Sequence, residues 1–83
     1  MNDKQKTKRK HDVRDLCRRA RTMAKAGKYR EAEKEYALAL ETDRTNVYAL
    51  VGLGDVKRKT RQFEEAVSYY QKALEVEKEN TFA

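Results

Sequence analysis

The fold is decided by residues 47–80, which have the sequence VYALVGLGDVKRKTRQFEEAVSYYQKALEVEKEN. Residues 13–46, VRDLCRRARTMAKAGKYREAEKEYALALETDRTN, align with this stretch without a gap, so the sequence repeats itself at a fixed interval, here called the repeat period. Ten aligned pairs are identical, whereas chance at ordinary composition gives roughly two or three. The identical pairs are Val13/Val47, Leu16/Leu50, Lys25/Lys59, Glu31/Glu65, Ala32/Ala66, Tyr36/Tyr70, Ala39/Ala73, Leu40/Leu74, Glu41/Glu75 and Asn46/Asn80. The 83 residues therefore hold two copies of one structural unit.

Each copy carries apolar residues at steps of three and four, the spacing that gathers side chains on one face of a helix. We expect helices over about 13–26, 29–43, 47–60 and 63–78, with turns at Gly27, at 43–46 and at 59–62. Proline is absent and there are only three glycines, so the turn residues that punctuate β-rich folds are missing. The pattern predicts an all-α fold.

A helix–turn–helix unit that recurs at the interval from Val13 to Val47 has the period of the tetratricopeptide repeat. The second copy resembles that family in Leu53-Gly54 and in the spacing of its later signature positions, which are Phe63, Ala66, Tyr70, Ala73 and Leu74. The resemblance implies two stacked repeats, 13–46 and 47–80, in a right-handed α-solenoid fragment. Residues 81–83 would then begin a third repeat, and residues 1–12 lie outside the resemblance. The implied function is that of a non-catalytic scaffold for protein–protein interaction.

Small residues occupy the positions at which paired helices must approach closely, and aromatic residues fill the space beside them. The small residues are Ala20, Ala32, Ala39, Gly54, Ala66 and Ala73. The aromatic residues are Tyr29, Tyr36, Phe63 and Tyr70. We therefore expect these ten positions to lie between helices.

The sequence departs from the family pattern at four positions. Arg44 and Lys78 stand where the family often has proline, and Lys57 replaces an aromatic residue. Arg19 replaces a leucine, and a polar residue there predicts that the first repeat caps the stack. The other end carries no polar capping helix, which indicates either a fragment of a longer array or a face that pairs with a second copy of the chain.

The usual catalytic and metal-binding sets are missing from the sequence. Cys17, His11 and Ser68 are the only residues of their kinds, so neither a nucleophile–histidine pair nor a histidine-rich metal site is indicated. We predict a non-enzyme without cofactor or metal, in which Cys17 is a small buried residue. No apolar stretch approaches the ~18 residues of a membrane span, which favours a cytoplasmic protein.

Charge is distributed unevenly. Residues 1–28 carry a net charge of +8 and residues 29–83 a net charge of −2, which together give the +6 of the chain. The two expected first helices carry +4 and +2, and the two second helices −3 and −2. One layer of helices is therefore basic and the other acidic.

In the family that the sequence resembles, the first helices line a concave groove. The candidate groove residues lie one turn apart on those helices: Arg14, Arg18, Arg21, Lys25, Tyr48, Asp55 and Lys59. A cationic groove of this kind predicts a partner peptide with an acidic segment. An alternative interpretation is that these Arg and Lys residues only favour the helix and solubilise its exposed face.

The N-terminal arm allows a second functional hypothesis. Its five cations are Lys4, Lys6, Lys8, Arg9 and Lys10. Such an arm, together with the first helix, could contact the phosphates of a nucleic acid without recognising its sequence. The acidic second helices and the absence of a recognition-helix or base-stacking motif argue against this function. An unstructured solubilising arm is the simpler interpretation.

Overall fold

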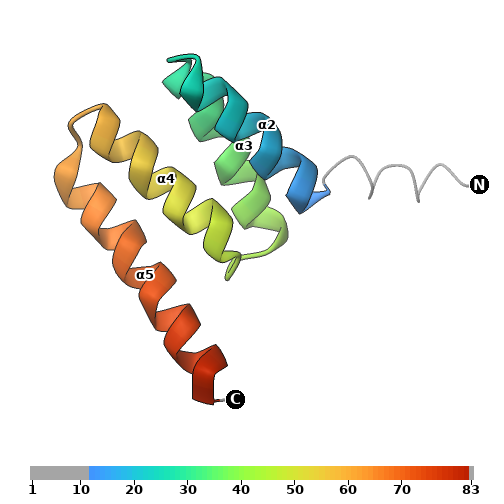
Figure 1. Ribbon diagram of the computed structural model, residues 1–83, viewed down its shortest axis with the longest axis vertical. Helices are drawn as coiled ribbons and strands as arrows, with labels where there is room; N and C mark the ends of the chain where they lie inside the picture. Colours follow the sequence, from blue (N-terminus) through green and yellow to red (C-terminus); the bar gives the residue numbers. More distant parts are fainter. Residues whose placement is uncertain (1–11, 83) are drawn as a thin grey trace, which may run out of the picture.

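A computed structural model describes residues 12–82. The described part is all-α, with four helices in two antiparallel hairpins: α2 (Val13–Lys25), α3 (Tyr29–Thr42), α4 (Val47–Lys59) and α5 (Phe63–Phe82). Figure 1 shows that α4 lies between the first hairpin and α5. The predicted fold class is confirmed. Residues 1–11 of the predicted arm lie outside the described residues.

The helix ends follow the repeat period. Asp12 caps α2 by accepting a hydrogen bond from the backbone N of Arg14 at 3.0 Å, and Asn46 caps α4 by accepting one from the N of Ala49 at 2.9 Å. After each of these helices the chain passes through a left-handed residue, Gly27 at φ 82° and Arg61 at φ 66°. Equivalent positions of the two copies therefore cap the first helix and form the left-handed turn after it.

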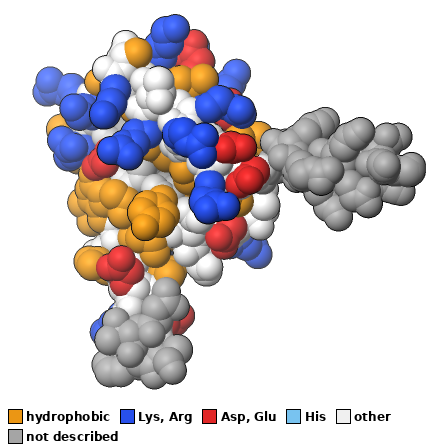
Figure 2. Space-filling model, turned by 45° about the vertical axis from the view of Figure 1, so that its right-hand side comes forward, with side chains coloured by type: hydrophobic (Ala, Val, Ile, Leu, Met, Phe, Trp, Pro, Cys, Tyr) orange, Lys and Arg blue, Asp and Glu red, His pale blue; other side chains and the backbone are white. Residues whose placement is uncertain are grey.

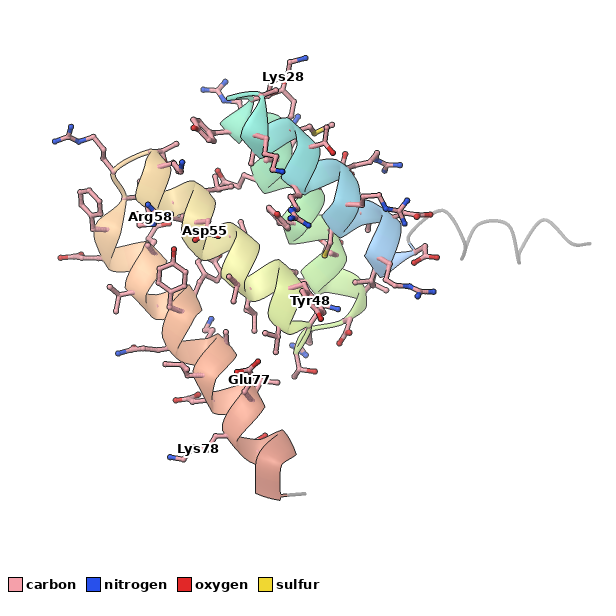
Figure 3. The ribbon with its side chains drawn as sticks, in the orientation of Figure 1. Lys28, Tyr48, Asp55, Arg58, Glu77 and Lys78 are labelled. Carbon is pink, nitrogen blue, oxygen red and sulfur yellow. The ribbon has the colours of Figure 1, made fainter. Side chains whose placement is uncertain are left out.

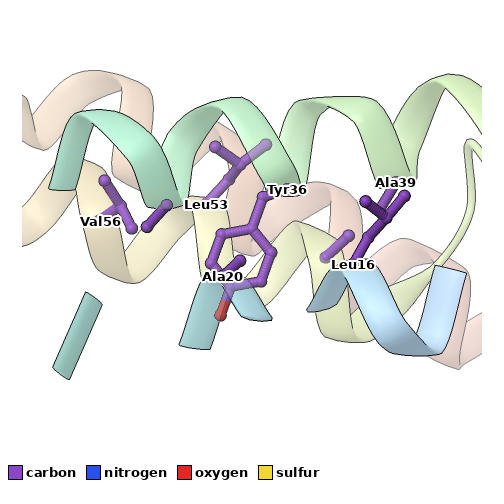
Figure 4. Packing of buried hydrophobic residues seen from close by; sticks show 8 residues of the cluster. Leu16, Ala20, Tyr36, Ala39, Leu53 and Val56 are labelled. Carbon is purple, nitrogen blue, oxygen red and sulfur yellow. The ribbon is translucent and has the colours of Figure 1, made fainter. Parts of the chain in front are cut away.

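The core is built mainly from small residues that allow the helices to pack closely. Leu16, Leu53 and Val56 are the largest side chains that are fully buried, and Tyr36 inserts between them from α3 (Figure 4). Buried alanines complete the contacts: Ala20, Ala32, Ala39, Ala49, Ala66 and Ala73. The helices approach closely at these alanines. A methyl group added at such a contact therefore has little free volume to occupy.

The outer face of α2 is polar. Arg19 is exposed and its guanidinium bonds Glu35 of α3 at 3.1 Å, while Arg18 pairs with Asp15 at 3.0 Å. Leu53, which is equivalent to Arg19 in the second hairpin, is buried. The polar surface of α2 has the character expected of a capping helix.

The structure differs from the sequence expectations at Phe63 and at the end of α5. Phe63 was expected between helices but is 55% exposed, because no described helix covers that side of α5. Helix α5 continues to Phe82, beyond its expected end at 78; that residues 81–83 begin a third repeat stays a prediction. The helix continues because no glycine or proline interrupts residues 63–82. Lys57 is buried, because its ammonium bonds both Glu33 of α3 at 2.8 Å and Glu65 of α5 at 3.0 Å. Within residues 12–82, no helix has the length and apolar content needed to cross a membrane.

Candidate functional site

Two adjoining hollows lie between α2 and α4, with volumes of about 620 and 220 Å³. Both are lined by Arg21, Tyr36, Gly52 and Asp55, so they form one continuous depression, here called the α2–α4 groove. The larger hollow lies toward the start of the two helices, where Val13 and Val47 line it. The smaller one lies toward their ends, at Lys25 and Lys59.

All seven residues predicted for the groove line it. Arg14, Arg18 and Tyr48 lie in the larger hollow, and Lys25 and Lys59 in the smaller one. The remaining two, Arg21 and Asp55, line both. Figure 3 shows Tyr48 and Asp55 on the same helix, α4. Helical spacing and the repeat period are therefore sufficient to gather these side chains; whether they bind a ligand stays a prediction.

The floor of the groove is Tyr36, which the sequence analysis assigned only to packing. Its ring comes from α3 and lies against the backbone of Gly52, where a Cβ atom would overlap the ring. Burial raises the pKa of the Tyr36 hydroxyl, and the nearby Cys17 and Asp55 raise it further, whereas Arg21 opposes them. Tyr36 therefore supplies a neutral phenol at neutral pH.

Cationic side chains dominate the groove. Six of them line it, Arg14, Arg18, Arg21, Lys25, Arg58 and Lys59, against the single carboxylate of Asp55. Figure 2 shows Lys and Arg side chains gathered beside a hydrophobic patch on the surface. The groove thus combines positive charge with apolar surface.

The one groove carboxylate is already engaged. Tyr70 donates its hydroxyl to Asp55 Oδ1 at 2.5 Å, and Arg58 lies 3.5 Å from the same oxygen. Arg58 also donates to the Tyr70 hydroxyl at 3.3 Å. Among the described residues, no acidic side chain pairs with four of the six cations: Arg14, Arg21, Lys25 and Lys59. These four cations remain available to an anionic ligand.

The larger hollow also has an apolar side. Tyr48 is 79% exposed at its edge, and Val51 is 38% exposed beside it. Val51 and Arg58 were not predicted as groove residues. Val51 could have been predicted from the repeat alignment, because it is equivalent to Cys17. Cys17 lines the same hollow from α2.

The Cys17 thiol is half-buried and lies 3.9 Å from Asn46 Oδ1, to which it donates a weak hydrogen bond. Burial raises the pKa of this thiol, and the carboxylate of Asp43 adds to the effect. Cys17 is therefore protonated at neutral pH and lacks the thiolate character of a reactive cysteine. Among residues 12–82, no three His, Cys, Asp or Glu side chains are arranged to hold a metal ion.

Comparison with known families identifies the second hairpin. A family model described as "Tetratricopeptide repeat" matches residues 47–80, the stretch that contains α4, the turn at Arg61 and most of α5. Residues 47–80 are a tetratricopeptide repeat. The match confirms the family that the sequence suggested, and such repeats are typically non-catalytic protein-interaction modules. No curated protein matches the chain.

The first hairpin has the same layout as this tetratricopeptide repeat, including a side-chain N-cap, a left-handed residue after its first helix and an antiparallel second helix. The family match itself covers only residues 47–80. That residues 13–46 are a second member of the family stays a prediction. The proposed contact of Lys4, Lys6, Lys8, Arg9 and Lys10 with phosphates concerns residues outside the described range and is also untested.

Proposed function

We propose that the chain is a non-catalytic interaction module that binds an acidic segment of a partner protein in the α2–α4 groove. The observation that carries the proposal is the charge imbalance of the groove, in which six cations face one engaged carboxylate. Four of those cations have no acidic partner among the described residues. A ligand rich in Asp or Glu supplies the missing charge.

The two chemical components of the groove suit different parts of one peptide. Arg14 and Arg21 can form charge-assisted hydrogen bonds with carboxylates, which are stronger than hydrogen bonds between neutral groups. The exposed ring of Tyr48 and the side chain of Val51 offer contact to an apolar residue of the same segment. An acidic peptide with one apolar side chain therefore matches the groove better than a purely acidic one.

Electrostatic attraction should act mainly on the rate of encounter. A cleft lined by one sign of charge raises the local concentration of oppositely charged ligands. At physiological ionic strength, exposed charges further apart than about 8 Å are largely screened. Binding should therefore weaken as salt is added, but the apolar contact at Tyr48 and Val51 should persist.

The test measures binding of a fluorescein-labelled peptide in which glutamates flank a single leucine. Reversal of the groove charge in Arg18→Glu/Arg21→Glu should weaken binding by about tenfold or more. The matched control is Arg30→Glu/Lys34→Glu, which changes the net charge equally at exposed positions on α3 that do not line the groove. Equal weakening by the two double variants would show that only the net charge matters and would overturn the proposal.

A further inference from the structure

Helix α5 exposes apolar side chains along one face. Phe63 is 55% exposed, Val67 52% and Leu74 65%, and half-buried Tyr70 lies on the same side of the helix. The spacing of these residues, four, three and four, places them on one stripe. This stripe of Phe63, Val67, Tyr70 and Leu74 is called the α5 outer face below.

The first hairpin shows what covers the equivalent stripe. The residues of α3 that correspond to Phe63, Tyr70 and Leu74 are Tyr29, Tyr36 and Leu40. Tyr36 lies against Gly52 of α4, and Tyr29 and Leu40 pack against the core to which α4 contributes Leu53 and Val56. The covering element is therefore a helix with a glycine at the point where the tyrosine ring meets it.

One difference between α3 and α5 changes the residue that a covering helix needs. Glu33 of α3 accepts a hydrogen bond from Lys57 of the covering helix at 2.8 Å. Its equivalent on α5 is Val67, which offers no acceptor for an ammonium. A helix that covers the α5 outer face therefore needs an apolar residue where α4 has Lys57.

Charge determines the direction of the covering helix. The basic end of α4, at Arg58 and Lys59, lines a hollow together with Tyr29, the first residue of α3, so α4 lies antiparallel to α3. Helix α5 begins with Glu64 and Glu65 in its first turn. Glu65 already bonds Lys57, so a helix antiparallel to α5 with a basic C-terminal end would place its positive charge beside the exposed Glu64.

Neither α2 nor α5 of a second copy meets these requirements. In α2, the residues at the positions of Gly52, Leu53 and Val56 are Arg18, Arg19 and Thr22, and both arginines are paired on the surface. In α5 itself, Ala66 and Ala73 are buried, so they are not free to accept a tyrosine ring from another molecule. Pairing between copies is therefore less suitable than docking of a different helix.

We propose that the α5 outer face docks one amphipathic helix of a partner protein, antiparallel to α5, with glycine or alanine against Tyr70, an aliphatic residue against Val67 and a basic C-terminal end. This surface is distinct from the α2–α4 groove. The docked helix repeats the relation between α4 and α3 on the open side of the molecule.

The chain's own α4 provides the probe. A labelled peptide spanning residues 46–60 with Lys57→Met carries the required glycine, aliphatic and basic positions. A lactam bridge between Val51→Lys and Asp55 holds it helical, which is necessary because isolated helices of this length are marginal in water. The full chain should bind this peptide saturably in fluorescence anisotropy, and the same peptide with Gly52→Arg should bind about tenfold more weakly or not at all.

Protein variants locate the site. Leu74→Glu should weaken binding of the peptide by about tenfold or more, whereas Ser68→Glu, an equal charge change at another exposed α5 position, should leave it unchanged. Circular dichroism confirms that both variants remain folded. Neither change should affect binding of the acidic peptide in the groove, so the two proposals fail independently.

Three results would overturn the proposal. The first is the absence of peptide binding to the full chain, and the second is equal binding to the Leu74→Glu variant. The third is a dimer in sedimentation equilibrium that Leu74→Glu dissociates and that the helical peptide does not displace, since the occupant would then be a second copy.

Discussion

The two hairpins share a backbone plan but differ in which of their surfaces are apolar. Ten of their aligned positions are identical, and the buried ones among them, such as Leu16/Leu50 and Ala32/Ala66, pack each pair of helices together. The first helices differ at Arg18/Gly52, Arg19/Leu53 and Thr22/Val56. Because of these three differences, α2 has one side in solvent, whereas α4 is covered on both sides.

This difference shows that identical and different positions have separate roles. In the first helices, the buried identity Leu16/Leu50 packs each hairpin, whereas the differences determine what can lie against the other side of the helix. The first hairpin presents ion-paired arginines on its α2 surface, and the second hairpin presents the apolar α5 outer face. The stack therefore has one polar end and one apolar end.

The contact between the hairpins is most sensitive at Gly52. Gly52→Ala and Gly54→Ala gain the same helix propensity, about 1 kcal/mol. The new methyl group at Gly52 overlaps the ring of Tyr36, which is held between helices and only 6% exposed. At Gly54 it meets Tyr70, 2.5 Å from Cε1. This ring is only half-buried and can shift more easily than Tyr36, although its hydroxyl bonds Asp55. We expect Gly52→Ala to be about 1–3 kcal/mol less stable than Gly54→Ala.

Urea unfolding of the two variants measures this difference. An additional reason to expect tolerance at Gly54 is that the equivalent residue of the first hairpin is Ala20, which is fully buried. Equal stabilities of the two alanine variants would contradict the close contact between Tyr36 and α4.

The turns offer a smaller comparison. Gly27 and Arg61 are equivalent residues with positive φ, 82° and 66°. An L-residue with a side chain pays a steric penalty in this conformation, so Arg61→Gly should stabilise the protein by about 1 kcal/mol. Gly27→Ala should destabilise it by a similar amount, about 1 kcal/mol, although a Cβ atom there meets nothing within 4 Å. Thermal melting of both variants provides the measurement, and shifts of the same sign would contradict the backbone argument.

The smallest effect at neutral pH is expected at Lys57, which joins the hairpins. Its hydrogen bond to Glu33 raises its pKa above the ordinary value of 10.5, with a further contribution from Glu65, while burial opposes them. Because the folded pKa is the higher one, this stabilisation is complete below pH 10.5 and is lost as the pH rises through the folded pKa. Both acids are substantially exposed, so the pairs contribute only about 0–1 kcal/mol.

The variant Lys57→Met keeps an unbranched chain and removes the titrating group. Its stability, measured by urea unfolding between pH 9 and pH 12, should fall less steeply than that of the unsubstituted protein. Burial also raises the pKa values of Tyr36 and Tyr70, which gives both proteins a common alkaline loss. Identical slopes for the two proteins would show that the ion pairs contribute nothing to folding.

Most of the fold followed from two periodicities of the sequence. The spacing of apolar residues predicted four helices, and the repeat period predicted that Gly27 and Arg61 occupy equivalent places. The end of α5 was predicted wrongly because Asn80 aligns with the cap residue Asn46, whereas nothing in residues 63–82 breaks a helix. The burial of Lys57 depends on acids from α3 and α5 that meet only in the folded structure.

The sequence predicted the groove residues that lie on one face of α2 and on one face of α4, but not the residue that α3 contributes. Residues one turn apart, from Arg14 to Lys25 and from Tyr48 to Lys59, line it as the spacing required. Tyr36 was missed as its floor because the ring reaches the groove from α3, behind the lining helices. Gly52 was the available signal, since a glycine in the middle of a helix indicates that something approaches the backbone closely.

The central position of α4 determines how the protein unfolds. This helix contributes seven buried residues, and Lys57 bonds acids on both of its neighbours, α3 and α5. Removal of the first hairpin would expose an apolar side of α4, and removal of the second would uncover Tyr36 on α3, so neither hairpin has a complete core by itself. Loss of structure should therefore be cooperative, with the described residues melting in one transition instead of two.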